Sequence, residues 1–140
     1  MRVEIKRAAA LDISNIIKRS PVAGAPNAEA DLKRYLGISY EAWTGLIDEE
    51  VVCVWGIISP TILSDKGYLW LLTTDLVDKH PFTFVRHSQI VIRDLMKHLN
   101  YIEGHVMTNS ERSIRWLKWL GFRMTNERHG MWTRFEMRAA

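Results

Sequence analysis

The chain has a single cysteine, Cys53, among its 140 residues, and this scarcity excludes several kinds of chemistry. One cysteine cannot form an intramolecular disulfide, and no group of cysteines and histidines has the spacing of zinc ligands. Cys53 lies in the apolar run of residues 51–55, where a free cysteine usually serves as a small core residue. We therefore predict no metal site and no cysteine nucleophile.

Long apolar runs are also missing. No run approaches the 18 residues of a membrane-spanning helix, and the N-terminal residues 1–7 alternate charged and apolar side chains, unlike a signal peptide. Internal repeats and low-complexity segments are absent, and 140 residues suit one domain, which we place at residues 1–140. We expect a cytoplasmic protein without a membrane span.

The charge balance is mildly basic, with a net charge of +3, and six tryptophans are many for this length. Such a charge permits an acidic ligand without requiring one. Basic residues beside tryptophans can bind single-stranded nucleic acid, but tryptophan and arginine also dominate protein–protein contacts. Because the net charge is modest, we expect protein partners and no nucleic-acid partner.

Hydrophobic periodicity predicts seven strands and four helices. The strands are expected at residues 2–8, 42–47, 51–58, 68–73, 101–108, 123–127 and 131–137, and the helices at residues 12–17, 28–36, 81–99 and 110–120. Asp12 is the expected N-cap of the first helix, Gly37 the stop of the second, and Pro81 a first-turn residue of the third. This order predicts an α/β (α+β) protein.

The most informative segment is residues 110–122, Ser-Glu-Arg-Ser-Ile-Arg-Trp-Leu-Lys-Trp-Leu-Gly-Phe, which predicts a short amphipathic helix between two strands. Together with the element order, this helix and its Gly-Phe exit resemble the GNAT (Gcn5-related N-acetyltransferase) fold over essentially the whole chain. The resemblance implies a single domain with a mixed central sheet of about six to seven strands, about four flanking helices and a C-terminal hairpin. It also implies acetyl-CoA as the cofactor.

In the family, backbone groups of the central strand bind the pantetheine arm of the cofactor. The resemblance assigns this role to Leu71, Leu72 and Thr73, opposite residues 106–107. Because backbone groups need no particular side chain, this part of a site survives sequence change. An ordinary core strand explains the same residues equally well.

The glycine loop with which the family binds pyrophosphate has no counterpart, since residues 68–103 contain no glycine. Pro81 also lacks one of the backbone donors that such a loop uses. Lys79, His80 and Arg86 could offer cations to a phosphate instead, although a solvated rim is the simpler interpretation.

Catalytic groups are hard to assign. Many family members have a tyrosine acid four residues before the glycine of Gly-Phe, and this chain has Leu117 there. The family asparagine at the start of the helix aligns with Ser110 and leaves Asn109 one residue early, so the resemblance makes both residues candidates for cofactor binding. The simpler interpretation is that Asn109 or Ser110 is the N-cap of the helix. Glu103 and His105 are the candidate bases on the preceding strand, although a lone histidine on a strand is usually structural.

A narrower resemblance begins at Tyr68. Residues 70–75 (Trp-Leu-Leu-Thr-Thr-Asp), the glycine-free helix and Ser-Ile-Arg-Trp-Leu-Lys-Trp-Leu-Gly are similar to GNAT-like internal virion proteins of T7-like short-tailed bacteriophages. This implies protein contacts in virion assembly, little or no acetyl transfer, and a location in the host cytoplasm during infection or in the virion interior. The alternative is an acetyl-CoA-dependent N-acetyltransferase with an atypical pyrophosphate site. The oligomeric state is left open.

Overall fold

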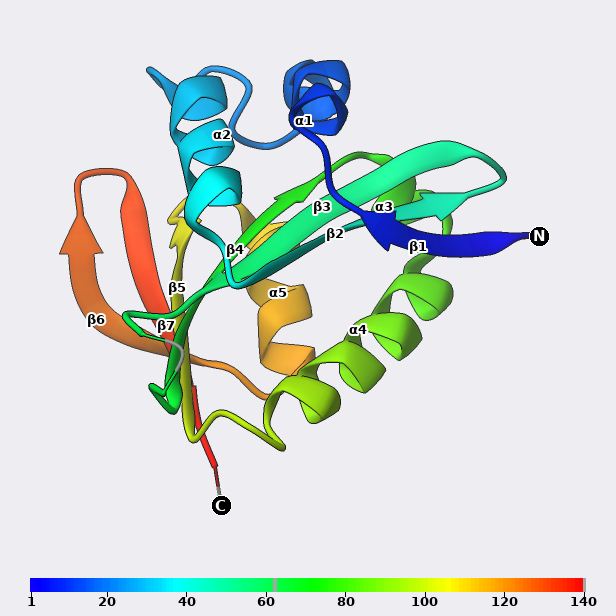
Figure 1. Cartoon of the computed structure of the whole chain (residues 1–140). Coiled ribbons are helices and arrows are strands. Elements are labelled where there is room, and N and C mark those ends of the chain that lie inside the picture. The colour runs from blue at the N-terminus through cyan, green and yellow to red at the C-terminus, as the bar shows by residue number, and fades with distance from the viewer. Residues whose placement is uncertain (62, 140) are drawn as a thin grey trace. The chain divides into compact units, whose positions relative to one another are not determined.

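Seven strands and five helices make up the computed structural model, which describes residues 1–61 and 63–139 (Figure 1). The elements are β1 (Val3–Arg7), α1 (Ala10–Ile16), α2 (Ala28–Ile38), β2 (Glu41–Ile47), β3 (Glu50–Ile58), β4 (Lys66–Thr73), α3 (Leu76–Lys79), α4 (Pro81–Leu95), β5 (Tyr101–Met107), α5 (Glu111–Trp119), β6 (Arg123–His129) and β7 (Trp132–Arg138). A 3₁₀ turn, Ile17–Arg19, follows α1. None of the described helices is long and apolar enough to cross a membrane.

The strand order is β1-β2-β3-β4-β5-β7-β6. β4 and β5 are parallel, whereas β1–β2, β2–β3, β5–β7 and β6–β7 are antiparallel, so the sheet is mixed. The chain closes with the β6–β7 hairpin. The predicted fold class is therefore confirmed.

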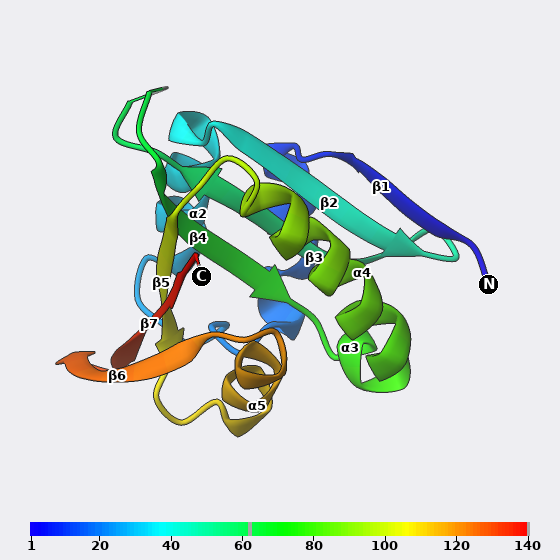
Figure 2. The ribbon, with the colours of Figure 1, turned by 90° about the horizontal axis from the view of Figure 1, so that it is seen from below.

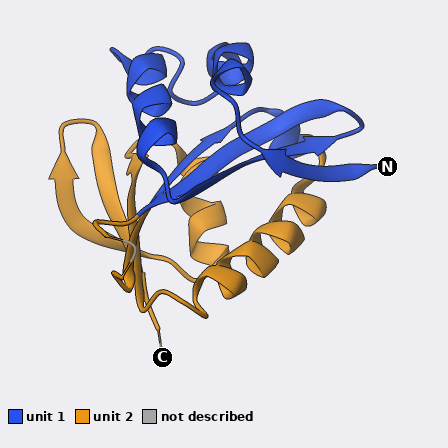
Figure 3. Cartoon of the chain, viewed as in Figure 1, with its two compact units in different colours: residues 1–58, 69–79 blue, residues 59–68, 80–140 orange. Residues whose placement is uncertain are grey.

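The chain forms two compact units that share β4 (Figure 3). Unit 1 comprises residues 1–58 and 69–79, and unit 2 comprises residues 59–68 and 80–140. The first three residues of β4 thus belong to unit 2 and the rest to unit 1.

Unit 1 is organised around β3, which is buried on both faces from Val52 to Val54. Its most constrained contact lies at Gly56, where an added Cβ would meet the indole of Trp70 at 2.6 Å. The Trp70 indole N–H donates to Ser39 Oγ at 2.7 Å, and Ser39 Oγ donates to the Tyr35 carbonyl at 2.6 Å. Gly56 of β3 therefore leaves room for the indole of Trp70, which reaches Ser39 at the end of α2.

Unit 2 places α5 beside β6, as Figure 2 shows. Its core contains two aromatic pairs: Phe84 with Trp116 at a ring-centroid distance of 4.6 Å, and Phe122 with Phe135 at 5.0 Å. Gly121 follows α5 with a φ of +102°, a conformation that glycine adopts without strain. The Gly-Phe exit of the helix thus turns the chain and inserts Phe122, which is 4% exposed, into the core.

Several helix positions differ from the sequence predictions. Asp12 is not the N-cap of α1: Ala9 holds that position, and the Asp12 carboxylate accepts the Ala9 N–H and the Thr44 hydroxyl at 2.9 and 2.8 Å. α2 continues through Gly37 to Ile38. α4 ends at Leu95 instead of residue 99, and the short helix α3 was not expected.

Candidate functional site

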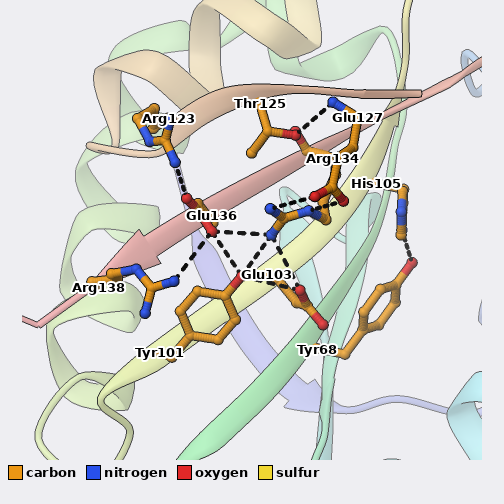
Figure 4. Close-up of polar contacts among 10 residues, drawn as sticks. All are labelled: Tyr68, Tyr101, Glu103, His105, Arg123, Thr125, Glu127, Arg134, Glu136 and Arg138. Carbon is orange, nitrogen blue, oxygen red and sulfur yellow. Dashed lines mark hydrogen bonds and ion pairs between the residues drawn. The ribbon is translucent and has the colours of Figure 1, made fainter.

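A polar face on unit 2 brings together several ionisable side chains (Figure 4). Along β5 the buried residues Ile102, Gly104 and Val106 alternate with less buried ones, so the side chains of Tyr101, Glu103 and His105 share the opposite face. The antiparallel register pairs these three with Arg138, Glu136 and Arg134 of β7, respectively. The polar face therefore comprises Tyr68, Tyr101, Glu103, His105, Arg123, Glu127, His129, Arg134, Glu136 and Arg138.

Glu136 is the centre of the charged part of the polar face, although its side chain is only 5% exposed. Its carboxylate accepts hydrogen bonds from Tyr101 Oη at 2.8 Å and from Arg134 Nη1 at 3.0 Å, and it also pairs with Arg123. Arg134 in turn binds Glu127, with 2.7 Å between Nε and Oε2. A buried carboxylate is thus compensated by several donors, as burial of a charge requires.

These contacts set the protonation states of the group. The hydrogen bond from Tyr101, followed by the two arginines, lowers the pKa of Glu136 to about 2. Burial and the neighbouring carboxylates raise the pKa of Tyr101 to about 12, so its hydroxyl stays protonated and acts as a donor. The charged part of the face is therefore fixed as ion pairs near neutral pH.

His105 forms the second part of the polar face. Its Nδ1 lies 2.9 Å from Tyr68 Oη, and its ring meets that of His129 edge-on at a centroid distance of 5.3 Å. His105 Nε2 is buried and has no hydrogen-bond partner among the described residues. Burial, and then the charge of His129, lower the pKa of His105, so the imidazole is neutral near neutral pH.

The two predicted catalytic candidates thus share one face of β5 and have different surroundings. Glu103 accepts the Tyr101 hydroxyl at 3.1 Å and Arg134 Nη1 at 3.4 Å, which holds its carboxylate in the charged network. His105 is neutral and retains an unpartnered ring nitrogen. Of the two, His105 is better suited to accept a proton.

Of the predicted cofactor-binding residues, Leu71, Leu72 and Thr73 form the end of β4 in unit 1. Leu72 and Thr73 are buried, 1% and 7% exposed, and Leu71 is half-buried. Just beyond them, Thr74 Oγ1 donates to the Val52 carbonyl at 2.9 Å, which anchors the strand end on β3.

The predicted phosphate-binding cations lie around the start of α4. Lys79 is exposed at the end of α3, His80 is the N-cap residue of α4, and Arg86 is exposed on that helix. Asp75, whose carboxylate would by itself repel a phosphate, is bound to Arg19, with 2.7 Å between Arg19 Nη2 and Asp75 Oδ1. The hydrogen bond from Arg19 lowers the pKa of Asp75, and the positive charge of Arg19 offsets the negative charge of the carboxylate.

Asn109 and Ser110 precede α5 in unit 2. Ser110 is the N-cap residue, but its hydroxyl donates to Ser113 Oγ at 2.9 Å, and it accepts no capping bond from a backbone N–H of the described residues. Asn109 is exposed. Among the described residues, no group of three or more histidine, cysteine or acidic side chains is arranged to hold a metal ion.

Comparison with solved structures shows what this architecture is similar to. An acetyltransferase from Bacillus subtilis, solved in complex with CoA, matches with a TM-score of 0.70 at 12% identity over 99% of both chains. The ribosomal-protein-S18-alanine N-acetyltransferase from Escherichia coli matches with a TM-score of 0.71 at 12% identity, over 98% of this chain and 94% of that one. An IAA acetyltransferase from Bacillus cereus matches with a TM-score of 0.69 at 11% identity, over 99% of this chain and 100% of that one.

The chain has the GNAT fold. No protein-family model and no curated protein sequence matches significantly, so the fold is established by structure and not by sequence similarity. None of the comparisons supports the predicted relation to internal virion proteins of bacteriophages or a location in an infected cell.

Two features distinguish this GNAT-fold chain from the family pattern used in the sequence analysis. Leu117, at the position of the family tyrosine, is 2% exposed and belongs to the core of unit 2. The segment before α4 forms the helix α3 where the family has a glycine loop. Residue 117 therefore has no acidic side chain, and the segment before α4 contains no glycine.

Sequence reasoning missed most of the polar face. Tyr68, Tyr101 and Arg134 were not predicted as site residues, although Tyr101-x-Glu103-x-His105 and Arg134-x-Glu136-x-Arg138 each show the period of two expected for one strand face. That alternation was the available signal. The Arg19–Asp75 pair, which joins residues 56 positions apart, had none.

Proposed function

We propose that the chain is an acetyl-CoA-dependent N-acetyltransferase with an atypical pyrophosphate site. The observation that carries this proposal is the full-length similarity of its fold to acetyltransferases, one of them solved with CoA. Because the identity is only 12%, the fold supports the reaction class and the acceptor is assigned only as an amine.

Binding of the cofactor would depend on the end of β4 and on cationic side chains. Backbone groups of Leu71, Leu72 and Thr73 would bind the pantetheine arm. Lys79, His80 and Arg86 would bind the pyrophosphate, replacing backbone N–H groups by side-chain cations. The exposure of Lys79 and Arg86 and the neutralisation of Asp75 by Arg19 fit this assignment.

Acetyl-CoA supplies an acetyl group activated as a thioester. In the proposed reaction, the acceptor nitrogen would form an amide bond to the acetyl carbon while the thioester C–S bond breaks and CoA leaves as its thiolate. His105 would take the proton of the amine: when its Nδ1–H donates to the Tyr68 hydroxyl, Nε2 carries the lone pair.

The alternative is a GNAT-fold scaffold that acts through protein contacts in virion assembly. It remains a prediction that rests on Leu117 and on the glycine-free segment. No comparison favours it, and the two functions differ in a simple property, since only the enzyme must bind acetyl-CoA.

The decisive experiment is titration of the protein with acetyl-CoA by isothermal calorimetry. We expect binding that weakens roughly 10- to 100-fold in Arg86→Ala, because a charge-assisted contact to phosphate contributes about 1.5–3 kcal/mol. Arg93→Ala is the matched control, since Arg93 is also exposed on α4 but lies in its last turn. Absence of binding at millimolar acetyl-CoA would refute the proposed enzyme function and leave the scaffold function as the remaining alternative.

A second experiment tests the assigned base. Release of CoA in the presence of a panel of amines should fall by about 10²-fold in His105→Gln, because general-base catalysis contributes on the order of 10²–10⁴ in rate. Acetyl-CoA affinity should stay unchanged in this variant. If the rate is unaffected while binding persists, His105 is not the base.

A further inference from the structure

β1 leaves one edge of the sheet without a neighbour. Among the described residues it stands first in the strand order and pairs only with β2 (Figure 1), and all five of its residues are exposed. Unpaired edges are templates for the addition of another strand. Two features of β1 indicate which strand could pair there: which of its backbone groups point to the free edge, and which side chains it carries.

The phase of hydrogen bonding is fixed at both ends of β1. Ala8 N–H donates to the Ala42 carbonyl at 3.1 Å, and the Arg2 carbonyl accepts from Asp48 N–H at 2.8 Å. Between these bonds the antiparallel register runs without a shift. Even-numbered residues therefore direct their N–H and C=O groups toward β2, and the odd-numbered Val3, Ile5 and Arg7 direct theirs to the free edge.

We propose that a second copy of this chain pairs with this edge, β1 against β1 in antiparallel orientation, with Ile5 opposite Ile5 of the second copy. This register places Val3 and Arg7 of one copy opposite Arg7 and Val3 of the other, so all the free edge groups meet partners. A two-fold axis through the Ile5 pair relates the copies, as a symmetric dimer requires.

The side chains agree with this register. Glu4 of each copy lies opposite Lys6 of the other, as a close, non-hydrogen-bonded pair of opposite charge. Lys6 is available because its contact to Asp12 is long, at 4.0 Å, and the Asp12 carboxylate already accepts two hydrogen bonds. A register shifted by one step in either direction loses this complementarity.

The other face of β1 supplies apolar surface. Val3 is 37% exposed and Ile5 is 45% exposed, and the neighbour of Ile5 on β2 is Gly45, which has no side chain to cover it. Pairing brings the two Ile5 side chains together and lays the Arg7 stem along Val3. Since only five residues of each copy take part, the interface is small. The fraction of the chain that is dimeric therefore depends on the protein concentration.

Multi-angle light scattering of the purified chain tests the proposal. We expect twice the monomer mass of 16.3 kDa at high concentration and the monomer mass on dilution. Glu4→Lys and Lys6→Glu, each alone, should be monomeric because like charges face each other, and an equimolar mixture of the two should recover the dimer. Native mass spectrometry then identifies the mixed dimer.

Amide hydrogen exchange of the unmodified chain provides an independent measurement. The amides of Val3, Ile5 and Arg7 should become protected as concentration rises, whereas those of Glu4 and Lys6, bonded within the monomer, should not change. A monomer at every concentration, edge amides that stay unprotected, or a dimer that survives Glu4→Lys would each overturn the proposed pairing.

Discussion

The two faces of the β5–β7 ladder show how one pair of strands is stabilised in two different ways. One face presents Ile102, Val106 and Phe135, which are 0%, 8% and 3% exposed, to the core. The other face presents Tyr101, Glu103 and Arg134 around the buried Glu136. The strands, backbone bonds and twist are common to both faces, so any difference between them comes from the side chains.

This difference lies in what each face requires. The apolar face depends on filled volume, and its contribution changes little with pH. The polar face depends on every partner being present and charged, because a buried carboxylate without donors is costly. The first face should therefore respond to changes of side-chain size, and the second to changes of charge.

The largest effect is expected on the apolar face. Phe135→Ala should lower the free energy of unfolding by about 3–5 kcal/mol, because it leaves a cavity and removes the edge-on contact to Phe122. Urea unfolding followed by far-UV circular dichroism measures the change. The control Phe82→Ala, at a residue that is 90% exposed, should stay within about 0.5 kcal/mol. Equal effects of the two variants would contradict the packing described.

On the polar face, Glu136→Gln keeps the shape and removes the charge. We expect a loss of about 1–3 kcal/mol in the free energy of unfolding, because two arginines and the Tyr101 hydroxyl lose their charged acceptor. Arg123→Ala serves as the control: its side chain is 71% exposed, so its ion pair should contribute at most about 1 kcal/mol. If Glu136→Gln leaves the free energy of unfolding unchanged, the network adds no stability.

Acid should weaken the polar face selectively. Since the pKa of Glu136 is lowered from 4.5 to about 2 in the folded state, its stabilisation is complete above about pH 4.5 and is lost as the pH falls toward about 2. The difference in unfolding free energy between the natural chain and Glu136→Gln should therefore shrink as the pH falls through this range. A difference that is constant with pH would refute the ion-pair assignment. For Phe135→Ala we expect no such trend.

The smallest effect concerns His105. Its imidazole should titrate below the ordinary value of 6.5, as measured by NMR of the ring nitrogens, because burial disfavours the charged form. His129→Gln should raise the pKa of His105 slightly, since it removes a neighbouring positive charge while the burial remains. Titration at or above 6.5 in the natural chain would be incompatible with the buried position.

Much of the fold could be predicted from periodicity. All seven strands were expected within a few residues of their positions, because alternation on β5 and β7 and the apolar run on β3 are local signals. Helix ends were less predictable. Gly37 lies within α2 and does not adopt a positive φ, so it does not end the helix. The helix ends two residues later, where the Ser39 hydroxyl donates to the Tyr35 carbonyl.

The candidate site was less accessible to sequence reasoning. Glu103 and His105 could be selected by residue type and position, but the properties that separate them depend on Arg134, from another strand, and on Tyr68, which lies 37 residues from His105. The neutralisation of Asp75 likewise depends on a distant arginine. Such pairings arise only when the chain is folded, and they decide which group can take a proton.

The parallel pairing of β4 with β5 also has a consequence for the time course of folding. The hairpin of β2 and β3 closes through the two residues Asp48 and Glu49, whereas Asp65 and Asn100, whose side chains bond at 2.7 Å beside the β4–β5 pair, are 35 residues apart. Hairpins form in about 1–10 μs, but closing a long loop costs entropy before any contact repays it. We therefore expect the hairpins to appear early and the β4–β5 pairing to be a late and rate-limiting event.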